Sequence, residues 1–290
     1  PIILLSVLSA GTSLAQEKQP LFYFKVYAGN GIFTPGSDGL RPSSVFDLGS
    51  GATVSYSYSK KSLGAGFNDG LGIEKPLGKI FSVGLDVNFL HGKTLTSNYS
   101  VYPPPTENIN YVTYAGSASY SVTTFIPNVS ATVFQKQGYS IYTRLGMIIA
   151  SKVKYQNTEN YVIQGNGTMP ITETLNMINS YGVEVGLNTS IGTRFNVWGP
   201  LKGIVEISDN LLSVSPKSAH QSGVVTEAYS VYVDDHITYI KSNSGVSTSN
   251  SAAAANGNGG GSITATDTEP SFNQHINNIV VTVGLAVAIK

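Results

Sequence analysis

Five charged residues are the strongest candidates for chemistry in this sequence. Each lies on the polar side of a segment in which apolar and polar residues alternate. If these segments are the strands of a narrow barrel, the five side chains point into its interior at a similar height. A buried charge without a partner costs several kcal/mol, so we expect the five to pair in a salt-bridge network. They are Lys25, Asp86, Arg144, Glu184 and Glu206.

Such a network has two possible roles. It could be a structural plug that fills the interior, or an ion path or gate. Eight-stranded barrels are filled by their own side chains and lack an open channel, which favours the plug.

The histidines are His91, His220, His236 and His275. Acyl transfer or ester hydrolysis needs a His beside a nucleophilic Ser, often with a carboxylate. His91 lies near the outer end of its segment, and His275 is close to Ser271 in sequence. Neither spacing is diagnostic of a triad. We therefore predict that the protein is not an enzyme and has no catalytic residue.

The run Asp234-Asp235-His236 could bind a cation. It lacks the spaced oxygen ligands of a calcium loop, so we expect a polar turn. Closely spaced glycines at positions 64, 66, 70 and 72 are not a dinucleotide loop, since no helix follows them. No metal or cofactor site is predicted.

The segments that position these residues have a strict two-residue period. Phe81, Val83 and Leu85 point one way, and Gly84 and Asp86 point the other, as side chains of a strand do. We predict eight such strands, with Asp69 as one polar residue on an otherwise apolar face. They cover residues 21–30, 62–74, 80–96, a segment ending at 133, 139–153, 177–191, 201–213 and 276–290. Pro127 cannot donate to a ladder, so we expect a bulge near 123–127.

The connections alternate in length. Residues 31–61, 97–119, 156–176 and 214–275 are expected to be long connections, and the others are short. Transmembrane barrels show this alternation, with short periplasmic turns and long extracellular loops. Residues 242–262 are rich in Ser, Asn, Ala and Gly, which predicts a flexible tether. Residues 224–240 alternate again, as an extracellular hairpin or as two further strands that would make ten.

Composition fits this class of protein. There is no Cys, which excludes disulfides, Cys-based zinc sites and thiol nucleophiles. The 17 basic residues balance 17 acidic ones, which argues against a nucleic-acid partner. Charged residues make up only 12% of the chain, against about 25% in an average soluble domain.

The first fifteen residues are uncharged and mostly Ile, Leu, Val, Ala and Ser, and Ser13-Leu14-Ala15 forms a small-x-small cleavage site. We expect 1–15 to be a signal peptide truncated at its start, and 16–290 to be the barrel domain. No later apolar run reaches the about 18 residues of a transmembrane helix.

The alternating strands and the loop pattern resemble the small bacterial outer-membrane β-barrels of the OmpX and OmpA-barrel type. The segment Ser13-Leu14-Ala15-Gln16 is similar to exported proteins of Bacteroidota. This resemblance covers about residues 21–290. It departs at the end of the chain, where Ala288-Ile289-Lys290 replaces the aromatic residue with which such barrels usually finish.

We therefore predict an all-β, antiparallel up-and-down transmembrane barrel in a Gram-negative outer membrane, with periplasmic termini. The expected role is structural or surface-interacting, with lipid, lipopolysaccharide and a surface or membrane protein as partners. The alternatives are a narrow pore for small solutes and a lipid A-modifying enzyme.

Overall fold

The computed structural model describes residues 20–32, 53–58, 64–102, 109–165, 170–226, 230–240, 248–252, 262–270 and 274–289. Every regular element in these ranges is a β-strand. The described part of the chain has no helix that could cross a membrane.

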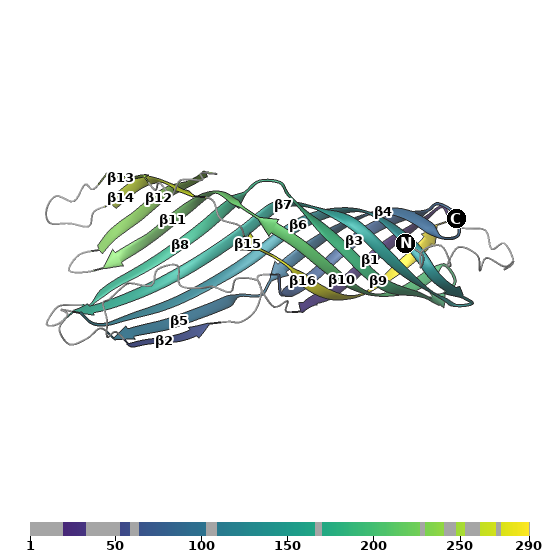
Figure 1. The fold of residues 1–290 in the computed structure, drawn as a ribbon, viewed down its shortest axis with the longest axis horizontal. Coiled ribbons are helices and arrows are strands. Elements are labelled where there is room, and N and C mark those ends of the chain that lie inside the picture. Colours follow the sequence, from purple (N-terminus) through teal and green to yellow (C-terminus); the bar gives the residue numbers. More distant parts are fainter. Residues whose placement is uncertain are drawn as a thin grey trace, which may run out of the picture.

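Eight antiparallel strands close into a barrel (Figure 1). Pairing of the first strand with the last, and of β6 with β7, completes the ring. In ring order the strands are β1 (Phe22–Ile32), β3 (Gly66–Pro76), β4 (Phe81–Gly92), β6 (Ile109–Lys136), β7 (Tyr139–Gly165), β9 (Glu184–Trp198), β10 (Leu201–Val214) and β16 (Asn278–Ile289). The predicted eight-stranded up-and-down barrel is confirmed.

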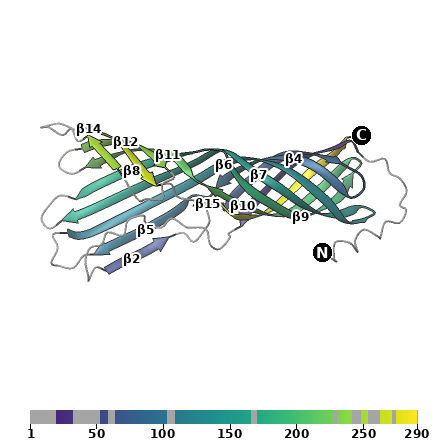
Figure 2. The same ribbon diagram turned by 45° about the horizontal axis from the view of Figure 1, so that its top comes forward.

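The strands β6 and β7 are 28 and 27 residues long and continue far beyond the barrel. Their outer halves are the centre of an open sheet, which we name the outer sheet (Figures 1 and 2). Its other strands are β13 (Thr248–Ala252), β14 (Ser262–Pro270), β12 (Ser230–Ile240), β11 (Pro216–Thr226) and β8 (Ile171–Tyr181) on the β7 side, and β5 (Leu95–Tyr102) and β2 (Thr53–Tyr58) on the β6 side. A short β15 (Gln274–His275) pairs with β10.

The outer sheet corrects several predictions. Each expected long connection contains strands, because polar Ser, Thr and Asn side chains do not prevent a backbone ladder. Residues 177–181 belong to β8 of the outer sheet, so the barrel strand begins only at Glu184. Strand β9 continues beyond the predicted end at residue 191, into the expected short connection, as far as Trp198. The hairpin near 224–240 is β11 and β12, outside the barrel, which excludes ten barrel strands.

The low-complexity segment 242–262 was predicted to be flexible. Its residues Thr248–Ala252 form β13, which pairs with β14. The predicted tether is wrong at these five residues, since the pairing satisfies their backbone groups. Apart from Ser262 at the start of β14, the rest of the segment lies outside the described residues, as does the expected signal peptide.

The register between β6 and β7 shifts between Ser121 and Thr123, which marks a β-bulge. The residue with a strained backbone at this bulge belongs to β7. Lys152 of β7 has a φ of 50°, the only positive φ of a non-glycine residue in the described ranges. Pro127 itself pairs with Leu85 of β4. The bulge is thus on β7, opposite Val122 at the edge of the expected segment 123–127, and it is five residues away from Pro127, so it does not accommodate the proline.

The outer face of β6 and β7 changes character at one level. Within the barrel its residues are apolar, such as exposed Phe125, whereas the inner face has polar residues such as buried Asn128 and becomes apolar from Ile126 and Ile148 upward. Beyond it, the face continuous with the outside carries Ser119 and Lys154, and the other face carries buried Tyr120. The barrel therefore has an outward-facing apolar belt that ends where the outer sheet begins.

Candidate functional site

Four buried residues form a connected charge network inside the barrel. Lys25 Nζ lies 2.8 Å from Asp86 Oδ1. Arg144 bridges two carboxylates, because its Nη1 donates to Asp86 Oδ2 and its Nη2 donates to Glu206 Oε1. Asp86 is fully buried, with 0% exposure. The bridge joins strands β1, β4, β7 and β10 across the interior.

Two residues that were not predicted extend this network. Arg194 Nη2 donates to both carboxylate oxygens of Glu74, at 2.9 and 3.0 Å, and Glu74 Oε2 lies 3.7 Å from Lys25 Nζ. The guanidinium of Arg194 also lies over the ring of Tyr23, 4.4 Å from its centroid. Three cations and three carboxylates thus form one group with balanced formal charge.

Neutral side chains add hydrogen bonds to the carboxylates. Tyr142 Oη donates to Glu206 Oε2 at 2.8 Å, and Ser208 Oγ donates to Glu206 Oε1 at 2.9 Å. Asn128 Nδ2 donates to Asp86 Oδ2 at 3.1 Å. Buried carboxylates that are paired and hydrogen-bonded in this way avoid most of the cost of burial.

Glu184 does not join this network. Its Oε1 accepts a hydrogen bond from the backbone N–H of Ser215, at 3.4 Å. Glu74 ends the predicted strand 62–74, but the predicted network does not include it. Arg194 was missed because its segment was assigned to a connection, where side-chain parity cannot be inferred.

A layer of amides occupies the interior beside the charges. Asn188 Nδ2 donates to Asn210 Oδ1 at 2.7 Å, and Asn210 Nδ2 donates to Asn278 Oδ1 at 2.8 Å. Asn278 Nδ2 in turn donates to the carbonyl of Gly64, at 2.8 Å. These bonds tie β9, β10 and β16 together from the inside.

An apolar cluster fills the interior where the barrel meets the outer sheet. It has no charged member, in contrast to the network. Its buried residues are Leu90, Leu95, Ala118, Tyr120, Val122, Ile126, Ile148, Ala150, Val153, Tyr155, Leu212, Val214 and Ile276. Charges, amides and apolar side chains together pack the barrel.

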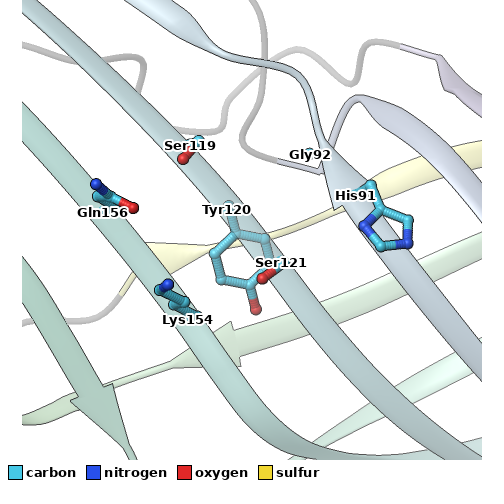
Figure 3. A pocket seen from close by; sticks show the side chains of 7 residues that line it. All are labelled: His91, Gly92, Ser119, Tyr120, Ser121, Lys154 and Gln156. Carbon is cyan, nitrogen blue, oxygen red and sulfur yellow. The ribbon is translucent and has the colours of Figure 1, made fainter.

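A second site lies on the outer surface, just beyond the apolar belt (Figure 3). This is a pocket of about 240 Å³ lined by His91, Gly92, Ser119, Tyr120, Ser121, Lys154 and Gln156. Strand pairing aligns His91, Ser121 and Lys154 in one row across β4, β6 and β7. The Nε2 atom of His91 is 3.6 Å from Asp69 Oδ1.

The other histidines lie elsewhere. His220 and His236 stack on β11 and β12, with ring centroids 4.8 Å apart. Asp234-Asp235-His236 was predicted to be a turn, but it lies within β12, because the hairpin reverses earlier, between Thr226 and Ser230. His275 is in β15, opposite Ser213. The described residues contain no cluster of three His, Asp or Glu that could hold a metal ion.

The fold defines a class of protein, the closed eight-stranded antiparallel β-barrels. No family model matches the chain, and no curated protein matches it either. Its function therefore has to be inferred from the barrel, the outer sheet and the two sites.

Proposed function

We propose that the protein is an outer-membrane β-barrel that anchors the outer sheet at the cell surface, where the sheet has a structural or surface-interaction role. The change of faces along β6 and β7 is the observation that carries this proposal. Two long strands present apolar residues outward over the barrel and polar residues outward beyond it. A boundary between hydrocarbon and water explains why the change occurs at one level.

The apolar belt supports contact with lipid. Leu145, Val185 and Val283 are 58%, 61% and 60% exposed although they are aliphatic. Soluble monomers rarely expose contiguous apolar patches larger than a few hundred Å². A closed barrel also satisfies its backbone groups internally, as a hydrocarbon environment requires.

The proposed orientation follows from the two ends of the barrel. The described chain ends meet at the end with short turns, where the N–H of Leu21 donates to the carbonyl of Ile289 at 2.7 Å. In outer-membrane barrels this end is periplasmic. The outer sheet would then stand outside the cell, available to other cells, lipopolysaccharide or membrane proteins.

The packed interior supports a plug in preference to a pore. The six charges are bridged to one another, and the apolar cluster fills the mouth. Planar bilayers test this directly. We expect purified protein to give no discrete conductance steps, whereas reproducible steps would favour the pore.

Insertion into lipid tests the anchoring role. Protein refolded with neutral liposomes should float with them and resist extraction at high salt. A chain that stays monomeric and soluble without detergent would contradict the proposal.

One observation favours a second candidate, a lipid-modifying hydrolase. Asp69 contacts His91, and Ser121 is the partner of His91 on the next strand, so an acid, a base and a hydroxyl share the outer face. Expression of the protein should then change the acylation of lipid A, and Ser121→Ala should abolish the change. An unchanged lipid A mass spectrum would exclude this candidate.

A further inference from the structure

We propose that the outer pocket binds the phosphate of an outer-leaflet lipid headgroup, with Lys154 as the principal cation. This proposal rests on the proposed membrane anchoring, to which it adds contact with a specific part of a lipid. The ligand that we expect in the pocket is a lipid with a phosphate in its headgroup, whose acyl chains lie along the apolar belt.

The pocket is at the right level for a headgroup. Strand pairing places Val87, Phe125 and Ile149 in one row, all apolar and outward-facing. The next outward row contains Phe89, Thr123 and Ser151, and the one after it contains His91, Ser121 and Lys154. The pocket therefore begins two rows beyond the hydrocarbon-like surface, where lipid phosphates are found.

The lining has the chemistry of an anion site. Two potential cations, two serine hydroxyls and an amide line it, and none of the seven lining residues is acidic. Lys154 is exposed on the outer face and takes part in none of the ion pairs of the described residues. Ammonium and hydroxyl groups are the usual donors to phosphate oxygens. Asp69, on the neighbouring strand, engages His91 and leaves Lys154 as the main charge.

The strained backbone next to the pocket adds a further cation. Without the bulge, the alternation that buries Ala150 would direct residue 152 into the apolar cluster. With Lys152 at a φ of 50°, Val153 is buried instead, and Lys152 is exposed like Lys154. Strained non-glycine residues persist where the surrounding structure holds them, often at functional sites. Here the bulge directs two lysines outward within three residues.

The pocket is large enough for a lipid headgroup but too small to enclose the whole lipid. Its volume of about 240 Å³ is below the roughly 300–1,000 Å³ of sites that enclose drug-sized molecules. The acyl chains would remain outside, against Phe89 and Phe125, which are 37% and 40% exposed.

Native mass spectrometry of the full chain, refolded in a neutral maltoside detergent, tests this site. The probes are dioctanoyl phosphatidic acid, dioctanoylglycerol and inorganic phosphate. We expect phosphatidic acid to bind, and Lys154→Gln to weaken its binding up to about fivefold, as for loss of one exposed ion pair. The matched control is Lys136→Gln, at the end of β6 and 15 residues from Ser121, which should bind like the wild type.

The probes separate the possible sources of binding. Equal binding of dioctanoylglycerol would mean that the apolar belt alone holds lipid, and equal binding of inorganic phosphate would mean a free-anion site. Either result overturns the inference, and so does a Lys154→Gln variant that binds like the wild type. Liposome flotation of the same samples distinguishes the two proposals. Protein that inserts but binds no phosphatidic acid refutes the lipid site alone, whereas protein that does not insert refutes the anchoring as well.

Discussion

Lys25 and Asp86 form a 2.8 Å ion pair across a strand that lies between them. Gly72 of β3 is the partner of Lys25 on one side and of Asp86 on the other. A Cβ atom at position 72 would lie 1.8 Å from Asp86 Oδ1. The absence of a side chain at Gly72 is therefore what allows the two charges to meet.

Gly72→Ala should disrupt this ion pair. The added methyl group forces Asp86 to move, and overpacking of this kind costs about 1–3 kcal/mol. Urea unfolding of the liposome-refolded barrel measures the loss. The control, Ala28→Val, adds volume to the outer face of β1 and should change the free energy of unfolding little. Equal effects of the two variants would contradict the crowded interior at position 72.

Arg144→Met should destabilise the barrel by about 3–5 kcal/mol, because it leaves two buried carboxylates without their shared partner. Both Asp86 and Glu206 lose a hydrogen bond from the guanidinium. The double variant Arg144→Met, Glu206→Gln leaves two buried cations and two buried carboxylates, because Asp86 keeps its ion pair with Lys25, and should recover much of the loss. Failure to recover any stability would show that shape, and not charge pairing, makes Arg144 important.

The apolar belt on β4 should not tolerate a carboxylate. Leu85 is 44% exposed on this belt, and Leu85→Asp should cost up to about 2 kcal/mol in lipid. The control, Leu85→Val, keeps the position apolar and should assemble like the wild type. The yield of heat-modifiable, folded barrel in membranes compares the two variants. Equal assembly of the two variants would mean that the outer face of β4 is wrongly assigned.

Glu173 should make the outer sheet more stable as the pH falls. Burial, and then the nearby Glu159, raise the pKa of this carboxyl above its ordinary value. The folded sheet therefore holds the proton more tightly than the unfolded chain does. This stabilisation is present at low pH and is lost as the pH rises through the folded pKa.

Hydrogen exchange of β8 amides tests the pH effect. At neutral pH, Glu173→Gln should increase protection relative to the wild type, because it removes the penalised charge. Below the ordinary pKa of a glutamate, the two proteins should be protected equally. A difference that does not depend on pH would assign the effect to packing.

The barrel could be predicted from the sequence because each of its strands has one apolar face. The pattern Phe81, Val83, Leu85 sets the side-chain parity, and parity alone places Asp86 inside. The outer sheet could not be predicted in the same way. Its strands carry residues such as Thr158 and Asn176, which hydrogen-bond to each other at 2.9 Å and give no apolar period. In the network, Lys25, Asp86, Arg144 and Glu206 are brought together, whereas Glu184 lies higher in the barrel, because strand tilt determines which residues share a level.

The sequence alone provided little indication of the outer pocket. Asp69 was recognised as a polar residue on an apolar face, and His91 as a residue near a strand end. Their contact, and their alignment with Ser121 and Lys154, depend on strand register. Register is set by all the strands of a barrel together, so no local pattern reveals it.

The most direct test of the membrane assignment is the surroundings of Leu145 in the liposome-refolded protein. The chain has no native Cys, so Leu145→Cys can carry a single nitroxide label, with Thr158→Cys in the outer sheet as the control. We predict that the label at position 145 is relaxed strongly by oxygen and weakly by a water-soluble nickel complex, and that the control shows the reverse. A label at position 145 that is shielded from both, as in a protein core, or that is relaxed mainly by nickel would contradict contact between the apolar belt and lipid.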